Sequence, residues 1–430
     1  KKIAKKFQKF LEHGPERLAG LRSGDIVQGA GGDACFCFGV RILSSDIKTR
    51  WGLILVIWAA GLGAAAQYGK ISVVFSRMGS LYPEAGASIG FTVSLVGLLG
   101  ILLGVVAGAF VASFGFRRTL VLSLWTGAVM SALQALHLPF PVFLATRIIE
   151  GLSHLGMVVA APTLIAQIAS DKDRGTALTL WGTFFGVAFT LLAWLGLPLA
   201  DRWGVLALFG AHAAIMALLA LGLARALRDV PVPARESLPG LAGLPALHWQ
   251  IYRSPRKLAP AAGWLFYTCC FVAILTILPP YIDAAARAFV MGAMPLASIA
   301  VSLTLGVYLL RHISAVQLIQ LGFLLCAACM VWLWAAPGLP AACIALAGAM
   351  GLVQGASFAA VPQLNETAAA RAESNGAMAQ AGNLGNTLGT PLFVAVTGAG
   401  GYPGLAVTAL VIYLTGFAVH MFLAHKRRLR

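Results

Sequence analysis

Apolar stretches of roughly 20 residues recur from Trp51 almost to the last residue of this chain, and no other feature limits its fold as strongly. A helix of that length crosses the hydrocarbon core of a bilayer, which is about 30 Å thick. Hydrophobic residues make up 59% of the 430 residues and charged residues only 11%, so a water-soluble domain could not bury this apolar surface. We therefore expect an all-α integral membrane protein.

The apolar stretches predict twelve transmembrane helices in a six-plus-six arrangement. The first six are expected near residues 52–77, 89–114, 119–138, 141–169, 176–200 and 205–226, and the second six near 261–282, 289–310, 315–336, 339–364, 377–399 and 403–424. The predicted domains are a cytoplasmic N-terminal tail over 1–50, an N-terminal six-helix bundle over 51–227, a cytoplasmic connector over 228–260 and a C-terminal bundle over 261–430 with a short basic tail.

The N-terminal tail allows two interpretations. Ile3, Phe7, Phe10 and Leu11 recur at helical spacing among lysines, which suits a short helix on an anionic membrane surface. The remaining tail has no clear periodicity, which favours an extension that function does not require.

The formal net charge of +16 reflects membrane topology. Most of the 31 Lys and Arg residues fall on one side when the N-terminus is placed inside, and only Arg77, Arg202 and Arg287 fall on the other. This positive-inside pattern predicts a multi-pass protein of a bacterial inner membrane with both termini in the cytoplasm. Because the pattern accounts for the basic balance, we expect no nucleic-acid partner.

The seven cysteines predict neither a disulfide framework nor a metal centre. Cys326 and Cys329 form a C-x-x-C pair inside an apolar span, with no His or acid nearby. Such residues are typical of small buried thiols, so we expect no metal and no cofactor.

An internal echo links the two halves of the chain. Glu150-Gly151, then Pro162 and Gly175, are matched by Gln354-Gly355, then Pro362 and Gly376. This alignment needs a gap of roughly one turn between the first Gly and the Pro. It predicts two pseudo-symmetric six-helix bundles.

The segment from Gly108 to Arg118 resembles the cytoplasmic loop signature of the major facilitator superfamily, with Gly108, Gly115, Arg117 and Arg118 at the matching positions. Ala112 stands where that family has an acid. In the family this acid helps to latch the two halves together, so the resemblance implies a gating role for the four matching residues and leaves the latch without its carboxylate. Asp171 and Asp173 in the next cytoplasmic loop are alternative partners for Arg117.

The segment from Leu144 to Gly151 resembles the family's fourth-helix motif, in which an intramembrane Arg is followed after two residues by a polar residue and Gly. The Gly-Pro signature of many drug/proton antiporters is absent from the fifth span. The resemblance covers residues 51–425 and is strongest to bacterial organic-anion or cyanate-permease-like members. It implies the twelve-helix fold, alternating access and no enzymatic activity.

Arg147, Glu150, Gly151 and His154 lie along one face of the fourth span. Ionisable groups inside a bilayer cost several kcal/mol unless they face a partner or a cavity, so they are candidate site residues. We expect Arg147 to hold substrate charge, and Glu150 and His154 to exchange protons. The alternative is an internal Arg–Glu pair that only orients the helix.

Lys70 is the second candidate cation, on the first span. Its position is similar to that of a basic residue in superfamily members that move organic anions. The alternative is that its ammonium reaches the outer interface and is solvated there.

In the second half, amides take the place of charges within the spans. Gln354, Asn383 and Asn386 are candidate substrate-binding residues, and interhelical hydrogen bonding is the alternative use of such amides. Tyr267 is expected to pack rather than to bind.

Glycines form two stripes at helical spacing: Gly97, Gly100, Gly104 and Gly108 on the second span, and Gly382, Gly385 and Gly389 on the eleventh. Small residues allow helices to approach closely. In the superfamily these helices face each other, so the stripes suggest surfaces on which the halves rock; static close packing would leave the same stripes.

Together these features predict a secondary active transporter. No Walker-type phosphate loop occurs, which argues against an ATP-driven pump on this chain, and a duplicated bundle with few buried charges favours alternating access over a channel. We expect a monomer that binds membrane lipid and moves a small solute, a small organic anion because of Lys70 and Arg147, with coupling to protons. The alternative is proton-driven efflux of amphipathic compounds or drugs.

Overall fold

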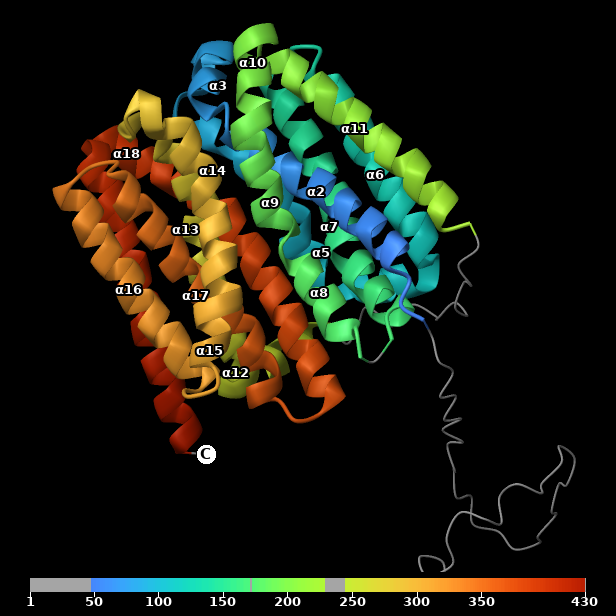
Figure 1. Cartoon of the computed structure of the whole chain (residues 1–430), viewed down its shortest axis with the longest axis vertical. Helices are drawn as coiled ribbons and strands as arrows, with labels where there is room; N and C mark the ends of the chain where they lie inside the picture. Colours follow the sequence, from blue (N-terminus) through green and yellow to red (C-terminus); the bar gives the residue numbers. More distant parts are fainter. Residues whose placement is uncertain (1–47, 171, 229–243, 430) are drawn as a thin grey trace, which may run out of the picture. The chain divides into compact units, whose positions relative to one another are not determined.

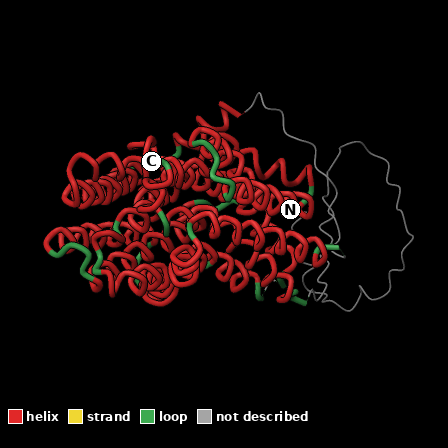
Figure 2. Tube along the Cα trace, turned by 90° about the horizontal axis from the view of Figure 1, so that it is seen from above, coloured by secondary structure: helices red, strands yellow, loops and turns green. Residues whose placement is uncertain are grey.

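The computed structural model describes residues 48–170, 172–228 and 244–429, and every regular element in these ranges is helical (Figure 2). Residues 1–47 lie outside the described residues, so both interpretations of the N-terminal tail stay predictions. Of the connector expected over 228–260, Arg228 and residues 244–260 are described. Leu244–Arg253 forms a short helix, and a second helix begins at Pro255.

The described N-terminal half contains the following elements: α2 (Trp51–Ser72), α3 (Phe75–Leu81), η2 (Pro83–Gly90), α4 (Phe91–Ser94), η3 (Leu95–Gly97), α5 (Leu98–Phe114), α6 (Phe116–Gln134), α7 (Phe140–Ile168), α8 (Arg174–Gly182), α9 (Phe184–Leu191), η4 (Leu192–Gly196), α10 (Leu197–Trp203) and α11 (Val205–Ala226). The α6 and α11 helices pack against each other and α7 packs on α6, while α2 contacts α7, α9 and α11.

The described C-terminal half contains α12 (Leu244–Arg253), α13 (Pro255–Ile277), η6 (Pro279–Tyr281), α14 (Ala284–Val301), η7 (Ser302–Gly306), α15 (Val307–Leu309), α16 (Ala315–Ala335), α17 (Pro340–Leu364) and α18 (Ala368–Arg428). In Figure 1, α3 and α10 lie at one end of the helices, and α12, α15 and the C-terminus lie at the other. The α9 and α14 helices run side by side between the halves.

Ten helices in the described part are long and apolar enough to cross a membrane. The sequence predicted twelve, and two features account for the difference. The α6 helix is not among the ten, because Arg117, Arg118 and its hydroxyl-bearing side chains lower its hydropathy. The expected eleventh and twelfth spans are joined in α18, which is interrupted at Gly401 by a non-helical backbone with φ of 59°.

Two glycines with positive φ occupy corresponding places in the two halves. Gly204 (φ 86°) joins α10 to α11, and Gly401 (φ 59°) divides α18 where the eleventh span was expected to end. Glycine adopts this backbone region without the strain that a Cβ atom causes. A glycine with positive φ therefore ends both the fifth and the eleventh predicted spans.

The packing of α7 and α17 gives the internal echo a different register from the one inferred from sequence. A Cβ atom on Gly151 of α7 would overlap the Val96 carbonyl, and one on Gly351 of α17 would overlap the Ser298 carbonyl. Each glycine thus permits the same close approach of a neighbouring helix. Gly351 lies 200 residues after Gly151, as Pro362 lies 200 residues after Pro162, so no gap is needed.

The two glycine stripes pack against different neighbours. Cβ atoms on Gly97, Gly100 and Gly104 would meet residues of α18, whereas nothing lies within 4 Å of Gly108. The stripe of α18 faces α13 of its own half, where Gly382 lies against Trp264 and Gly389 against the Cys269 carbonyl. The expectation that both stripes form the surface between the halves is therefore wrong for α18, because its glycines serve close packing inside the C-terminal half.

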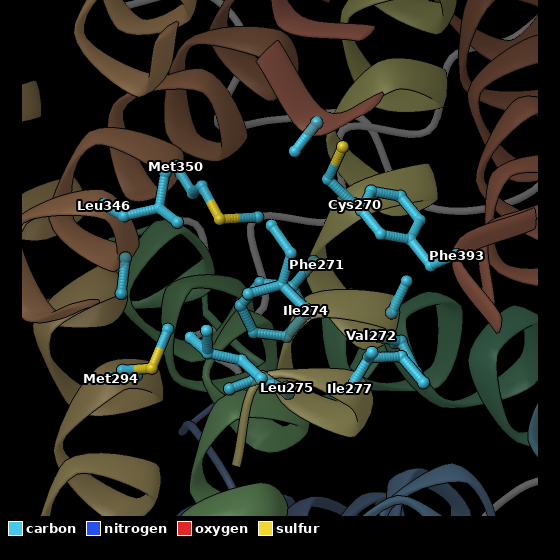
Figure 3. Packing of buried hydrophobic residues seen from close by; sticks show 14 of the residues in the cluster. Cys270, Phe271, Val272, Ile274, Leu275, Ile277, Met294, Leu346, Met350 and Phe393 are labelled. Carbon is cyan, nitrogen blue, oxygen red and sulfur yellow. The ribbon is translucent and has the colours of Figure 1, made fainter. Parts of the chain in front are cut away.

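One hydrophobic core runs through both halves. The cluster shown in Figure 3 centres on α13, where Cys270, Phe271 and Ile274 pack against Met350 of α17 and Phe393 of α18. It continues into α2 and α9 of the other half. The polar groups described next are therefore surrounded by apolar side chains.

Candidate functional site

A fully buried ionic cluster occupies the interior of the N-terminal half. Lys70 of α2 contacts Glu150 of α7, with 2.7 Å between Nζ and Oε1, and Arg147 of α7 forms an ion pair with the other carboxylate oxygen of Glu150. All three side chains have an exposed fraction of 0%. One carboxylate is therefore shared by two cations. Lys70 does not reach the outer interface, so the snorkelling alternative is wrong.

The guanidinium of Arg147 also holds the segment before α5. Its Nε donates to the Thr92 carbonyl at 2.7 Å and its Nη2 donates to the Gln67 carbonyl at 2.6 Å. Three helical segments thus meet on one planar group. Five donors in a rigid fork make Arg suited to such a junction, which a lysine could not form.

Polar side chains from α6 and α11 complete the cluster. Ser131 Oγ accepts from Lys70 Nζ at 2.6 Å and lies 2.7 Å from Nδ1 of His212, while Gln134 donates to Glu150 Oε2 at 2.9 Å. His212 Nε2 donates to the Gly63 carbonyl at 3.0 Å, since a carbonyl oxygen only accepts. Lys70 and Arg147 against the single carboxylate of Glu150 give the ionic cluster a formal excess of one positive charge.

His154 faces a different direction from its neighbours on α7. Its Nδ1 lies 3.1 Å from the Ala64 carbonyl, and its ring packs edge-on against Tyr68 with 5.1 Å between the centroids. Neither ring nitrogen is hydrogen-bonded to Glu150. Sequence spacing placed Arg147, Glu150 and His154 on one face, and the structure brings only the first two together.

The three candidate amides of the C-terminal half have separate environments. Gln354 of α17 accepts from Tyr267 Oη at 3.2 Å and from Ser298 Oγ at 3.4 Å. Asn383 of α18 donates to the Ala379 carbonyl within its own helix at 2.8 Å. The Oδ1 atom of Asn386 is buried and has no hydrogen-bond partner. Tyr267, expected only to pack, is thus also a hydrogen-bond donor.

When each residue of the first half is aligned with the residue 200 positions later, two of these contacts correspond between the halves. His154 corresponds to Gln354, and Tyr68, which packs on His154, corresponds within one residue to Tyr267, which donates to Gln354. Each half therefore presents a tyrosine against a polar side chain on its fourth helix. The ionic cluster has no counterpart, because Ala347 and Met350 stand where the first half has Arg147 and Glu150.

Several buried hydroxyl groups lie where the halves meet. Tyr68 Oη and Thr387 Oγ1 both lie beside Gly97, and neither has a hydrogen-bond partner. Thr390, one turn after Thr387 on α18, also has an unpartnered hydroxyl. Buried polar atoms are almost always paired, so these hydroxyl groups are candidate contacts for a substrate or for water between the halves.

An aromatic row connects these groups across the interface. Phe185 of α9 lies 5.9 Å from Tyr68 and 6.3 Å from Phe271 of α13, measured between ring centroids. Phe271 in turn stacks with Tyr267 at 5.2 Å, and Tyr267 with Trp264 at 4.9 Å. Aromatic rings at these separations attract each other and offer flat surfaces to an apolar ligand group.

The four residues expected to gate lie at the end of α5 and the start of α6. Gly115 turns the chain with φ of 94°, and Arg117 and Arg118 follow it with exposed side chains. Of the alternative partners for Arg117, Asp171 lies outside the described residues. The Asp173 carboxylate accepts from Thr49 Oγ1 at 2.5 Å, and no ion pair joins it to Arg117 in the described part of the chain.

Gln380 of α18 joins both halves to the connector helix α12. Its amide nitrogen donates to the Ile101 carbonyl of α5 at 3.1 Å and lies 3.1 Å from Nε2 of His248, and its carbonyl oxygen accepts from Tyr252 Oη at 3.0 Å. Burial raises the pKa of the Tyr252 phenol above its usual value, so this donor stays protonated at neutral pH. Ile251 anchors α12 in a small core beside it.

Sequence reasoning missed Gln67, Ser131, Gln134 and His212. Each is a polar side chain in an otherwise apolar span, and each is fully or almost fully buried. Polarity inside a predicted span was the available signal.

The comparison with protein families agrees with the fold. The profile of the Major Facilitator Superfamily matches residues 53–390. This chain belongs to the major facilitator superfamily. Membership supports a role in membrane transport and a small-molecule substrate, and it confirms the family that the loop and fourth-helix motifs indicated.

Two solved structures of the superfamily fold are similar to this chain. Both are of a bacterial homolog to the human lysosomal transporter Spinster. The inward-facing, occupied form has a TM-score of 0.71 at 15% identity, over 88% of this chain and 97% of that one. The inward-facing, unoccupied form has a TM-score of 0.66 at 14% identity, over 87% and 97%.

Similarity to a curated relative is confined to a short segment. Major facilitator superfamily domain-containing protein 10 of Bos taurus is 32% identical over 139 residues, which is 32% of this chain and 27% of that protein. The match thus spans about a quarter of the relative's length.

Proposed function

We propose that this superfamily member is a secondary active transporter that moves a small organic anion by alternating access, with Glu150 as the group that takes up the coupled proton. The observation that carries the proposal is the charge of the buried cluster. Lys70 and Arg147 share the carboxylate of Glu150, and Glu150 is the only fully buried acid in the described part of the chain.

Excess positive charge away from water favours an anion. At an effective dielectric constant of about 20, one such charge attracts a carboxylate about 8 Å away by roughly 2 kcal/mol. The substrate need not displace the contacts of Arg147, because this attraction extends to the interface beside Tyr68. There, the unpartnered oxygens of Asn386, Thr387 and Thr390 offer neutral contacts from the opposite half.

Proton coupling follows from the same contacts. A proton on Glu150 removes the only negative charge between two cations and weakens both ion pairs. Arg147 also donates hydrogen bonds to the Thr92 and Gln67 carbonyls. A change in its ion pair with Glu150 therefore alters the contacts of the segment before α5 and of the C-terminal part of α2. Movement of α5 against α18 would then follow protonation. His154 remains a second candidate for proton exchange, through the interface rather than through Glu150.

The proposed topology has twelve spans in two pseudo-symmetric bundles, with both termini in the cytoplasm of a bacterial-type cell. The ten candidate spans become twelve when α6 is included and α18 is divided at Gly401. The corresponding glycines, Gly151 and Gly351, support the two-fold relation. Inter-half hydrogen bonds occur toward both ends of the helices: Ser72–Thr276 and Thr190–Gly292 toward the end with α3 and α10, and Gln380–Ile101 toward the end with α12.

The test is uptake by proteoliposomes from a panel of labelled anions, cations and neutral solutes, with and without a pH gradient. We expect an anion to accumulate when the gradient is applied. Lys70→Gln removes the excess charge and should raise the apparent KM for that anion about tenfold, as should Arg147→Gln. Transport of a cation in preference to anions, or an unchanged KM in both folded variants, would contradict the anion proposal.

Coupling is tested in the variant Lys70→Gln/Glu150→Gln, which keeps one excess positive charge but lacks the carboxylate. It should exchange labelled for unlabelled anion yet fail to concentrate it under a pH gradient. Concentration equal to that of the parent would show that Glu150 is structural.

One observation favours the alternative of amphipathic efflux. The aromatic row from Phe185 through Phe271 to Trp264 crosses the interface and suits an apolar substrate group. Phe185→Leu, at a half-buried member of the row, should weaken transport of an aromatic amphipathic compound and leave a small aliphatic anion unaffected. If transport of only the aromatic substrate is lost, the aromatic row acts in efflux of amphipathic compounds.

A further inference from the structure

A groove at the membrane edge, away from the ionic cluster, has both charged and apolar walls. It lies where α5 turns into α6 and has a volume of about 570 Å³. Gly115, Arg117 and Arg118 line its charged end, and Val121, Leu122 and Ala224 line its apolar walls. Two helices, α6 and α11, thus form a slot with guanidinium groups at one end.

The two arginines lack an anion. Both side chains are exposed, and neither has a hydrogen bond or ion pair with any residue that the structure describes. They stand in the first turn of α6, which contains no acidic residue. The N-terminus of a helix carries a partial positive charge, so cations there repel it and an anion is favoured. Ala112 leaves the preceding helix without the acid that the loop signature has.

Apolar side chains continue from the groove along both helices. On α6, Leu122 and Val129 are each 50% exposed, and on α11, Leu218 and Leu221 are 69% and 58% exposed. They follow one another at helical spacing, so they form two apolar tracks that begin at the groove. A molecule with an anionic head and hydrocarbon chains complements this arrangement.

We infer that the groove binds an anionic phospholipid of the leaflet that Arg117 and Arg118 face. Guanidinium groups bind phosphate oxygens in a planar, bidentate geometry, and the acyl chains then lie along Leu122 and Leu218. Free phosphate would use the arginines but leave the apolar walls uncovered, which is why a lipid fits better. Bound lipid would supply the negative charge that the loop signature normally takes from its own acid.

The experiment measures lipid retained by the full chain. Protein purified from vesicles of equal phosphatidylglycerol and phosphatidylcholine is analysed by native mass spectrometry. We expect the parent to retain phosphatidylglycerol preferentially, and Arg117→Gln/Arg118→Gln to retain roughly tenfold less. Lys426→Gln/Arg428→Gln is the matched control, because it removes two exposed charges from the end of α18 and should retain lipid like the parent.

Two further measurements distinguish the effect of charge from that of groove shape, and binding of lipid from binding of phosphate. Ala224→Trp fills the groove without changing charge and should also lower retention. Inorganic phosphate at about 10 mM should not displace the lipid, since it gains nothing from the apolar walls. Equal losses in the arginine variant and the control, full retention in Ala224→Trp, or displacement by phosphate would each overturn the inference.

Discussion

The sharing of one carboxylate by two buried cations gives a charge-balance prediction. The perturbation is a double-mutant cycle at Lys70 and Glu150, with Glu150→Gln, Lys70→Gln and the double variant. The parent cluster has one excess positive charge, Glu150→Gln has two, and the double variant returns to one. Stability should therefore be lowest in Glu150→Gln and should recover when Lys70 is removed as well.

The magnitude follows from the distance between the charged groups. At 2.7 Å and an effective dielectric constant of about 20, the attraction between Lys70 and Glu150 is about 6 kcal/mol before desolvation is subtracted. Removal of one partner of a buried ion pair costs about 3–5 kcal/mol, because the other charge stays buried without compensation. We expect Glu150→Gln to lose that amount and the double variant to regain at least about 2 kcal/mol.

The assay is thermal unfolding in detergent, in which Glu150→Gln should lower Tm by on the order of 5 °C relative to the parent. Arg77 and Asp201 supply the matched control, since they form an ion pair at the end with α3 and α10, with side chains 35% and 55% exposed. Their cycle should give a coupling below about 1 kcal/mol, because solvent screens the pair. A Glu150→Gln variant as stable as the parent, or a double variant no more stable than Glu150→Gln, would refute the shared-carboxylate reasoning.

Two other predictions concern the surface between the halves. Gly100→Val should slow transport and lower stability by about 1–3 kcal/mol, because its Cβ would overlap the Asn383 side chain. Gly222→Val on α11, with nothing within 4 Å, should transport like the parent, and equal uptake by both variants would contradict the close approach of α5 to α18. Gln380→Leu should release α12 and cost about 1 kcal/mol, because exposed Tyr252 and the part-buried Ile101 carbonyl lose their partner. Release of α12 is measured as increased maleimide labelling of Ala377→Cys in a background without Cys35 and Cys37, because Ala377 is buried in the core that contains Ile251 of α12. Unchanged labelling would show that α12 does not depend on Gln380.

Local patterns in the sequence predicted local parts of the site. Arg147 and Glu150 are three residues apart, so helical geometry alone places them on one face, and the structure pairs them. Lys70 and Glu150 are 80 residues apart, and only the packing of α2 against α7 shows that they touch. Sequence could place Lys70 inside a span but could not choose between a buried partner and the outer interface.

The fold was predictable at the level of spans and family, and less so at their boundaries. Apolar length and basic loops predicted the membrane class and the six-plus-six order. The status of α6 depends chiefly on Arg117 and Arg118, which lower its hydropathy, and less on Ser131 and Gln134, whose side chains donate to Glu150. The α2 and α7 helices carry the charged residues of the cluster and are still among the ten candidate spans, so the buried charges did not hide those spans.

The two halves share backbone packing but differ in charge, and this difference bears on mechanism. Gly151 and Gly351 preserve the same close helix approach, and each half presents a tyrosine beside the polar group on its fourth helix. Among the described residues, fully buried ion pairs occur only in the half with Glu150. If the halves rock about a common surface, the proton acts on one side of that surface while the other supplies neutral contacts. An anion bound between them would be attracted by the first half and oriented by the second, so its charge and its shape would be recognised by different bundles.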